Sequence, residues 1–194
     1  MEHAVLLVDD AVRFCHSLQP LLQAERYQVD FAHSGAEALD RLQQRSYAAA
    51  LVDINLPDMA GTEIASHLGT HHPDTAVIIL TGNATVDNAV ESLRQGVYDY
   101  IRKPCAPEGL LRTLEHAIQH KQLQRELRTS EKRFRQLAQA TWEGIIIYDR
   151  GTLLQTNTQL CRMFGYREEE LIGRQVFSVL LDRATIRAMN PGGD

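Results

Sequence analysis

The sequence predicts an α/β protein whose first 120 residues fold around a parallel β-sheet. Short unbroken apolar segments, of which Ala4–Val8 is the first, alternate with segments that have the apolar periodicity of helices. Strands of a parallel sheet are buried on both faces, so they carry continuous apolar runs rather than an alternating pattern. Strand and helix units of this kind, five in number, fill residues 1–120. Residues 121–194 follow a different pattern.

Each element of this first region has its own local signal. Apolar runs predict strands at residues 4–8, 27–32, 48–53, 75–81 and 98–101. Helical patterns predict helices through residues 18–22 and over 35–44, 63–68 and 86–95, with a fifth helix from Pro107, a residue accepted in a first helical turn. Ser34 precedes the second helix and Glu37 follows three residues later, which predicts a capping box.

Composition restricts the class of protein. The chain has 194 residues, 44% of them apolar, and a net charge of −5, which gives no support for nucleic-acid binding. No apolar run approaches the roughly 20 residues of a membrane helix, and acidic residues interrupt the N-terminal apolar run, unlike a signal peptide. The 3 cysteines form no CxxC pair. We therefore expect free thiols and a cytoplasmic protein that binds neither nucleic acid nor membrane.

Polar side chains stand where the predicted strands end. Asp9 and Asp10 follow the first strand, Asp53 ends the third, Thr81 ends the fourth and Lys103 follows the fifth. In open α/β sheets the functional crevice lies at the carboxyl ends of the strands. Neighbouring carboxylates repel each other, so a cation should lie beside them, and three of them suit Mg²⁺. A carboxylate beside Mg²⁺, a lysine and a hydroxyl can accept a phosphoryl group.

Residues 1–120 resemble the receiver domain of two-component response regulators. The resemblance rests on the paired acids, on Asp53-x-x-Leu56-Pro57-x-Met59-x-Gly61, on Thr81-Gly82 and on Tyr100-x-x-Lys103-Pro104, in this order at strand ends. It implies a flavodoxin-like sheet with strand order 2-1-3-4-5. It also implies that Asp53 is phosphorylated by a partner histidine kinase or phosphotransfer protein.

The same resemblance implies roles for the other residues. Asp10, Asp53 and the backbone carbonyl of Asn55 would ligate Mg²⁺, with Asp9 assisting through water. Lys103 would contact the phosphoryl group, and the Lys103–Pro104 bond would be cis, a state that proline makes accessible. Thr81 would move toward the phosphoryl group while Tyr100 rotates inward.

Other interpretations of these residues remain open. Asp9 and Asp10 could cap a helix, because aspartate is a favoured N-cap. Thr81 could be a strand terminus, and Tyr100 a half-buried aromatic of an edge strand. In function, the alternatives are a metal-dependent phosphatase that forms an aspartyl phosphate, or an adaptor that is never phosphorylated. Phosphatases of the haloacid type need a DxD pair after the first strand, which this sequence lacks, so we expect no enzyme beyond slow self-dephosphorylation.

The pattern of residues 121–140 predicts a signalling helix. Its seam positions follow one another at alternating steps of four and three residues: Leu123, Leu127, Ser130, Phe134 and Leu137. This seam is out of phase with the apolar residues by which the fifth helix is expected to pack on the receiver. Such a seam is typical of a parallel two-stranded coiled coil, so we expect a homodimer. A solvated helix with Glu–Arg pairs is the alternative. His116 and His120 lie four residues apart but have no third ligand nearby, and we interpret them as surface residues.

Residues from about 131 to 181 resemble the front half of a PAS sensory domain. A strand, a turn at Asp149–Gly151 and a second strand are followed by Asn157, by Phe164-Gly165-Tyr166 and by Glu170-Leu171-Ile172-Gly173. The last three strands of a PAS fold have no counterpart in the polar segment that follows. We therefore expect three parts: a receiver over 1–120, a linker helix over 121–140, and a partial PAS-like domain over 141–194 that is either truncated or degenerate.

Overall fold

The structure is a computed structural model that describes residues 3–82, 96–176 and 178. Contacts divide the chain into two compact units, Met1–Glu126 and Leu127–Asp194, which we describe separately. The helix predicted over residues 86–95 and the polar segment after residue 181 lie outside the described residues.

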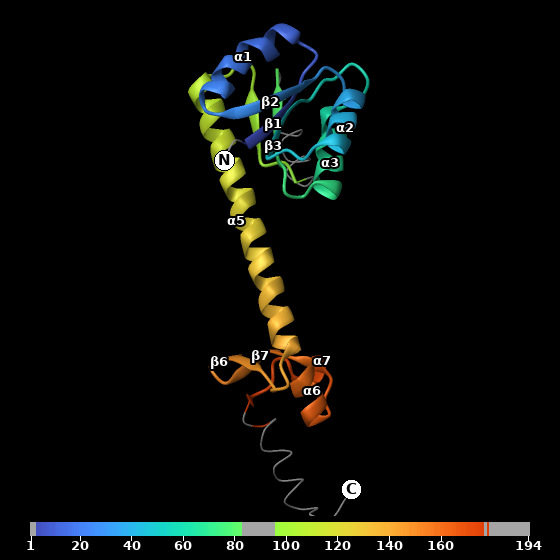
Figure 1. Ribbon diagram of the computed structural model, residues 1–194, viewed down its shortest axis with the longest axis vertical. Coiled ribbons are helices and arrows are strands. Elements are labelled where there is room, and N and C mark those ends of the chain that lie inside the picture. The colour runs from blue at the N-terminus through green and yellow to red at the C-terminus, as the bar shows by residue number, and fades with distance from the viewer. Residues whose placement is uncertain (1–2, 83–95, 177, 179–194) are drawn as a thin grey trace, which may run out of the picture. The chain divides into compact units, whose positions relative to one another are not determined.

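The first unit is built on a five-stranded parallel sheet, as the sequence predicts. Its strands are β1 His3–Val8, β2 Tyr27–Ala32, β3 Ala49–Asp53, β4 Ala76–Thr81 and β5 Asp99–Arg102. They lie in the order β2-β1-β3-β4-β5, and every neighbouring pair is parallel (Figure 1). The predicted strand order 2-1-3-4-5 is therefore confirmed.

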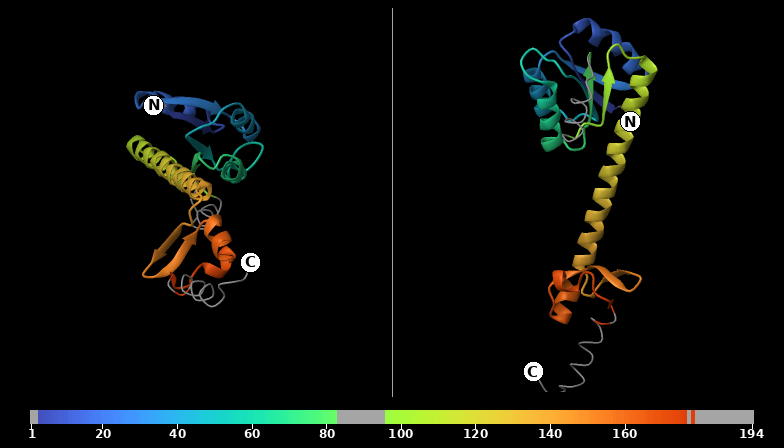
Figure 2. Two further views of the ribbon diagram at one scale, coloured as in Figure 1. Left: turned by 60° about the horizontal axis from the view of Figure 1, so that its bottom comes forward. Right: turned by 180° about the vertical axis from the view of Figure 1, so that it is seen from behind.

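Helices cover both faces of this sheet. They are α1 Val12–Ala24, α2 Gly35–Gln44, α3 Gly61–His71 and α5 Pro107–Ala140. The helix α1 and the first turns of α5 pack on one face, while α2 and α3 pack on the other (Figures 1 and 2). Alternate residues of each strand face the two layers, so Leu7 lies in one core and Leu6 in the other. This two-sided burial explains the unbroken apolar runs.

The start of α2 differs in one detail from the predicted capping box. The Glu37 amide donates to Ser34 Oγ at 3.1 Å, as expected for an N-cap. The Glu37 carboxylate, however, accepts from the His33 amide at 2.8 Å, one residue before the cap. That hydrogen bond is the main reason why the pKa of Glu37 is lowered. The reciprocal half of the predicted box is therefore displaced by one residue.

Strand register brings the carboxyl ends together. Val8 of β1 pairs with Val52 of β3, and Asp53 pairs with Leu80 of β4. Thr81 in turn pairs with Arg102 of β5. Because all five strands run in the same direction, the residues that follow them meet at one edge of the sheet.

The second unit begins in the last turns of α5 and continues into an antiparallel hairpin. Its elements are β6 Ile146–Asp149, β7 Thr152–Thr156, α6 Thr158–Phe164 and α7 Glu168–Leu171. The turn residues Arg150 and Gly151 have φ angles of 47° and 84°, the left-handed values that tight hairpins require. Leu153, Leu160, Leu171 and Val176 form a small core.

Asn157 connects the parts of this second unit. Its buried side chain accepts from the amides of Leu160 and Ile145, at 3.0 and 2.9 Å. Its amide nitrogen donates to the carbonyls of Ala138 in α5 and Glu143, at 2.7 and 2.8 Å. One side chain therefore caps α6 and also joins the hairpin to the end of α5. Among the described residues of both units, no helix has the length and apolar character needed to cross a membrane.

Gly61 should tolerate a side chain poorly. Its amide donates to the Ile54 carbonyl at 2.8 Å, and an added Cβ would lie 2.0 Å from the Asp53 carbonyl oxygen. We expect Gly61→Ala to lower the free energy of unfolding by about 2 kcal/mol, because backbone must move. Gly109→Ala in α5 is the control: nothing lies within 4 Å, so stability should rise by up to about 1 kcal/mol. Equal denaturation midpoints for Gly61→Ala and wild type would show that the close approach is unimportant.

Candidate functional site

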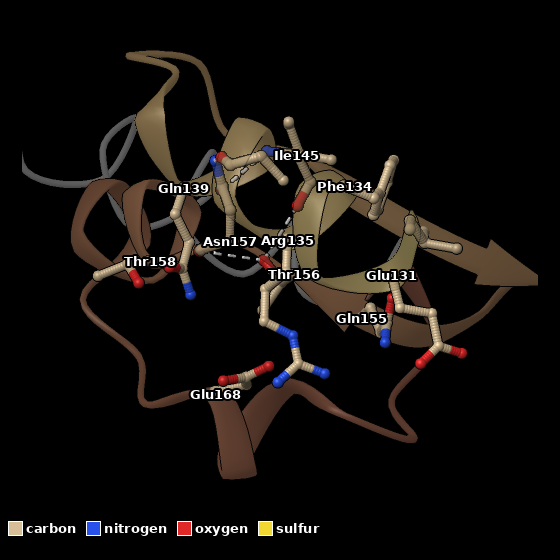
Figure 3. A pocket seen from close by; sticks show the side chains of 12 residues that line it. Glu131, Phe134, Arg135, Gln139, Ile145, Gln155, Thr156, Asn157, Thr158 and Glu168 are labelled. Carbon is tan, nitrogen blue, oxygen red and sulfur yellow. Dashed lines mark hydrogen bonds between the residues drawn. The ribbon is translucent and has the colours of Figure 1, made fainter. Parts of the chain in front are cut away.

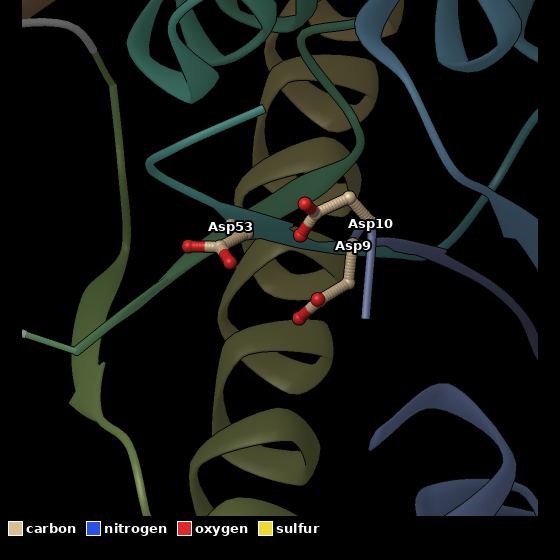
Figure 4. Close-up of side chains that lie close together, drawn as sticks. All are labelled: Asp9, Asp10 and Asp53. Atoms are coloured by element: carbon tan, nitrogen blue, oxygen red, sulfur yellow. The ribbon is translucent and has the colours of Figure 1, made fainter. Parts of the chain in front are cut away.

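Three carboxylates converge at the carboxyl edge of the sheet. Asp9 and Asp10 follow β1, and Asp53 ends β3. One carboxylate oxygen of each lies within 4.8 Å of the others, and Figure 4 shows the three side chains around one space. Asp9 is buried, Asp10 is exposed and Asp53 is partly exposed. The geometry places concentrated negative charge at a position that solvent can reach.

Lys103 is the cation that the adjacent acids require. Its Nζ donates to Asp53 Oδ2 at 2.7 Å and also to Asp9 Oδ2. The lysine follows β5, where its backbone amide donates to the Thr81 carbonyl at 2.7 Å. The ring of Phe14 lies 4.6 Å below the ammonium group, a favourable cation–π distance. Lys103 therefore joins the ends of β1 and β3 through its charged group and the end of β4 through its backbone amide.

The acids keep this lysine charged. Burial alone would lower the pKa of Lys103, but the hydrogen bonds to Asp53 and Asp9 and their negative charges outweigh burial, and the pKa is raised. The ammonium group is therefore protonated throughout the physiological range. A buried carboxylate such as Asp9 needs a permanent partner of this kind.

Asp9 has further contacts that fix its position. Its second oxygen, Oδ1, accepts from the Ala11 amide at 3.0 Å. Its backbone carbonyl accepts from Cys15 Sγ at 3.5 Å and lies 3.0 Å from His33 Nδ1. The N-cap of α1 is Ala11, which has no side-chain cap, so neither aspartate serves as the N-cap of this helix. Burial, followed by the charge of Asp9, raises the pKa of Cys15 to about 11.

The remaining residues of the predicted site lie around this centre. Thr81 is buried at the end of β4, and Tyr100 is half-buried on β5 opposite Ile79. Burial raises the pKa of the Tyr100 phenol. The backbone amide of Asn55 donates to Asp53 Oδ1 at 3.3 Å. The Lys103–Pro104 peptide bond is cis.

The donor set fits Mg²⁺. Three carboxylates carry a charge of −3 when ionised, and Lys103 contributes +1, so the cluster retains −2. One divalent cation would balance that charge. Carboxylate and carbonyl oxygens with room for water are the ligands that Mg²⁺ prefers. An acidic triad of this kind is typical of the Mg²⁺ site of receiver domains.

Two contributors to the site were not found from the sequence. The Phe14 ring contacts Lys103, and His33 contacts the backbone carbonyl of Asp9, as described above. Asp58, in the loop after β3, instead binds the start of α2: it accepts from the backbone amides of Gly35 and Ala36 at 2.8 Å each, and these bonds lower its pKa. Each of these contacts joins residues distant in sequence, which a local pattern does not reveal.

The second unit contains a cavity of about 380 Å³. It lies between the last turns of α5, the hairpin and the first residues of α6 and α7 (Figure 3). Phe134, Ile145 and Ile147 give it an apolar side, and Figure 3 shows the Arg135 side chain extending toward Glu168. Asn157 reaches its edge, but the hydrogen bonds of that side chain serve the fold. Nothing in this lining specifies a ligand class.

Comparison with known proteins agrees with this geometry. Residues 5–115 match the response regulator receiver domain family, and residues 132–192 match a PAS domain family. The first match covers more than half of the chain. The protein therefore belongs to the response regulator receiver family, and a long helix and a PAS domain follow its receiver.

Particular relatives are similar over part of the chain. The transcriptional regulatory protein ZraR of Klebsiella oxytoca is 36% identical over 119 residues, which is 61% of this chain and 27% of that protein. SrrA of Staphylococcus aureus is 34% identical over 111 residues, 57% of this chain and 46% of that protein. The chain thus spans between about a quarter and half of these relatives. A CheY-like receiver structure from Methanospirillum hungatei JF-1 has 32% identity and a TM-score of 0.62, covering 64% of this chain and 99% of that one.

Removal of the Lys103 charge should destabilise the protein in the absence of divalent cations. Lys103→Met leaves the buried Asp9 without its ammonium partner, so we expect a loss of about 3 kcal/mol in the free energy of unfolding. Saturating Mg²⁺ should restore part of this loss, because another cation then neutralises the cluster. Denaturant titrations with chelator or with Mg²⁺ measure both effects. Lys132→Met on the exposed part of α5 is the control and should change neither.

Equal unfolding midpoints for Lys103→Met and Lys132→Met in chelator would contradict this role of Lys103. So would equal stabilisation of wild type and Lys103→Met by Mg²⁺.

Proposed function

We propose that this protein is a cytoplasmic response regulator whose Asp53 accepts a phosphoryl group from a histidine kinase or phosphotransfer protein. One observation carries the proposal: Lys103 Nζ bridges Asp53 and the buried Asp9 within a cluster that retains net negative charge. Membership of the receiver family supports the same assignment. A nucleophilic carboxylate beside a fixed cation is the arrangement that phosphoryl transfer needs.

In the proposed reaction an oxygen of Asp53 attacks the phosphorus as the bond from phosphorus to the donor nitrogen breaks. Lys103, already 2.7 Å from Asp53, would then bind a phosphoryl oxygen. Asp10, Asp53 and the Asn55 carbonyl would hold Mg²⁺, which supplies charge neutralisation at the phosphoryl oxygens. Asp9 would assist through water, because Ala11 and Lys103 already engage its two oxygens.

The proposed output begins at Thr81 and Tyr100. The Thr81 hydroxyl would move toward the phosphoryl group, and Tyr100 would rotate into the space that it leaves. Tyr100 lies on β5, the strand that leads through the Lys103–Pro104 bond into α5. Such a rotation would reach α5 at its first turns, whose Leu110 and Leu114 are buried in the core.

Two other functions fit the site less well. A phosphatase of the haloacid type would need a second acid two positions after its nucleophile, and Asp9-Asp10-Ala11 does not supply one. Release of phosphate from diverse phosphoesters would favour the phosphatase, whereas a receiver takes a phosphoryl group and loses it slowly. An adaptor that is never phosphorylated would not need Lys103 and three carboxylates together.

Asp53 should be the only phosphoacceptor. Incubation with a small-molecule phosphodonor and Mg²⁺ should add the mass of one phosphoryl group to the intact chain. Asp53→Asn should abolish the addition, because the amide is a poor nucleophile. Asp58→Asn, in the same loop but bound to the start of α2, should still be labelled. Equal labelling of Asp53→Asn and wild type would overturn the proposal.

The second half of α5 is proposed to be a dimerisation helix between the receiver and a partial PAS-like domain. Leu110, Leu114, Ala117 and Ile118 are buried, but the apolar seam residues beyond them are exposed. The exposed fractions are 66% for Leu123, 61% for Leu127, 52% for Phe134 and 70% for Leu137. These residues repeat at coiled-coil spacing, so a second copy of the helix would cover them.

Charged residues introduced into the seam should dissociate the dimer into monomers. Leu127→Glu with Phe134→Glu places like charges opposite each other, and we expect a monomer by analytical ultracentrifugation that still accepts a phosphoryl group. Thr129→Glu with Gln136→Glu adds the same charges off the seam and should leave the dimer intact. Helix pairing through so short a seam is only marginally stable. A change of about 1.4 kcal/mol in the free energy of pairing on phosphorylation would therefore change the pairing equilibrium about tenfold.

Equal self-association of the two double variants would exclude the seam as the interface. Wild type that stays monomeric at tens of micromolar, with and without phosphorylation, would exclude the homodimer.

A further inference from the structure

Three histidines gather at the far end of α3. His67 and His71 lie four residues apart on the helix, and His72 is its C-cap. The rings of His67 and His71 are stacked, with centroids 4.4 Å apart and an interplanar angle of 23°. The ring of His72 lies 6.0 Å from that of His67. None of these residues contributes to the phosphoacceptor site.

The surroundings of His67 favour its neutral imidazole. Burial, followed by the charges that His71 and His72 would carry, lowers the pKa of His67. Neutral imidazole is the form that binds metal ions. The lowered pKa therefore favours the metal-binding form of His67.

His71 is oriented by a contact of the kind that supports metal ligands. Its Nδ1 lies 3.2 Å from the backbone carbonyl of His67. Because a carbonyl oxygen can only accept, Nδ1 is the donor in this contact, and in the neutral ring the lone pair is then on Nε2. Metal-binding histidines commonly donate their other nitrogen to such an acceptor. The carboxyl end of a helix also carries partial negative charge, which favours a cation there.

We propose that His67, His71 and His72 form a binding site for a divalent transition metal ion of the Zn²⁺ type. A pair of histidines four residues apart on one helix presents two nitrogens on one face, and His72 supplies a third. Imidazole nitrogens suit Zn²⁺, Ni²⁺ and Cu²⁺, whereas Mg²⁺ prefers oxygen. This site would therefore be distinct in chemistry from the acidic cluster.

Metal binding requires the rings to turn. Among the described residues, only Asp9, Asp10 and Asp53 already bring their ligand atoms within 4.8 Å of one another. His71 is exposed, and His67 and His72 are half-buried, so rotation about their side-chain bonds leaves the core in place. Three histidines would leave the fourth position of a tetrahedral ion to water.

The cluster lies at the opposite end of α3 from the phosphoacceptor site. Gly61 begins the helix beside Asp53, and the 11 residues of α3 span about 15 Å. Just after His72, the Pro73 carbonyl accepts from Lys121 Nζ at 2.9 Å, and Asp74 pairs with Arg125 at 3.7 Å. The proposed metal site thus adjoins the segment that contacts α5, and it does not rest on phosphorylation of Asp53.

Calorimetric titration of the full chain with Zn²⁺, in excess Mg²⁺, tests the proposal. We expect one equivalent to bind and the ring-proton NMR signals of the three histidines to shift. His67→Ala with His71→Ala should weaken binding at least about tenfold, and His72→Ala should weaken it measurably. His116→Ala with His120→Ala removes a pair of the same spacing on α5 and should leave the affinity unchanged.

Equal loss of affinity in the two double variants would overturn the proposal, as would Zn²⁺ binding that leaves the three ring signals unshifted. The denaturation midpoint of each variant without metal is also measured as a check of folding. If the His67–His71 double variant fails that check, the exposed His71→Ala single variant replaces it, and unchanged affinity there would equally overturn the proposal.

Discussion

The ion pairs of Lys103 with Asp9 and Asp53 are the interaction on which the site depends. Asp9 is fully buried, and a buried carboxylate without a partner would cost several kcal/mol. Lys103 removes that cost while it leaves the cluster net negative. The same lysine holds Asp53 at 2.7 Å and joins the ends of three strands through its side chain and amide. Stability and the proposed phosphoryl chemistry thus share one group.

The fold explains why such a cluster can exist. A parallel sheet covered on both faces directs all its carboxyl ends to one edge, where side chains from distant parts of the sequence meet. Lys103 is 50 residues from Asp53 and 94 from Asp9, yet strand register brings all three together. The apolar strands provide rigid support, and Gly61 lets α3 begin against the backbone of Asp53.

Much of this was predictable from sequence because the signals are local. Unbroken apolar runs identify the strands, and the polar residues that end them identify the site edge. The displaced bond of Glu37 to His33 and the contacts of Asp58 with α2 were not predictable, since backbone geometry decides them. The three histidines at the carboxyl end of α3 are close in sequence, but only the fold shows that the His72 ring lies 6.0 Å from the ring of His67.

The most direct test of the central claim is to locate the acyl phosphate itself. After treatment with a phosphodonor and Mg²⁺, borohydride reduction converts a phosphorylated aspartate to homoserine. Peptide mass spectrometry then identifies the position of the homoserine in the chain. We expect homoserine at position 53 alone, and only when a divalent cation is present. Homoserine at position 9 or 10, or none at position 53, would contradict it.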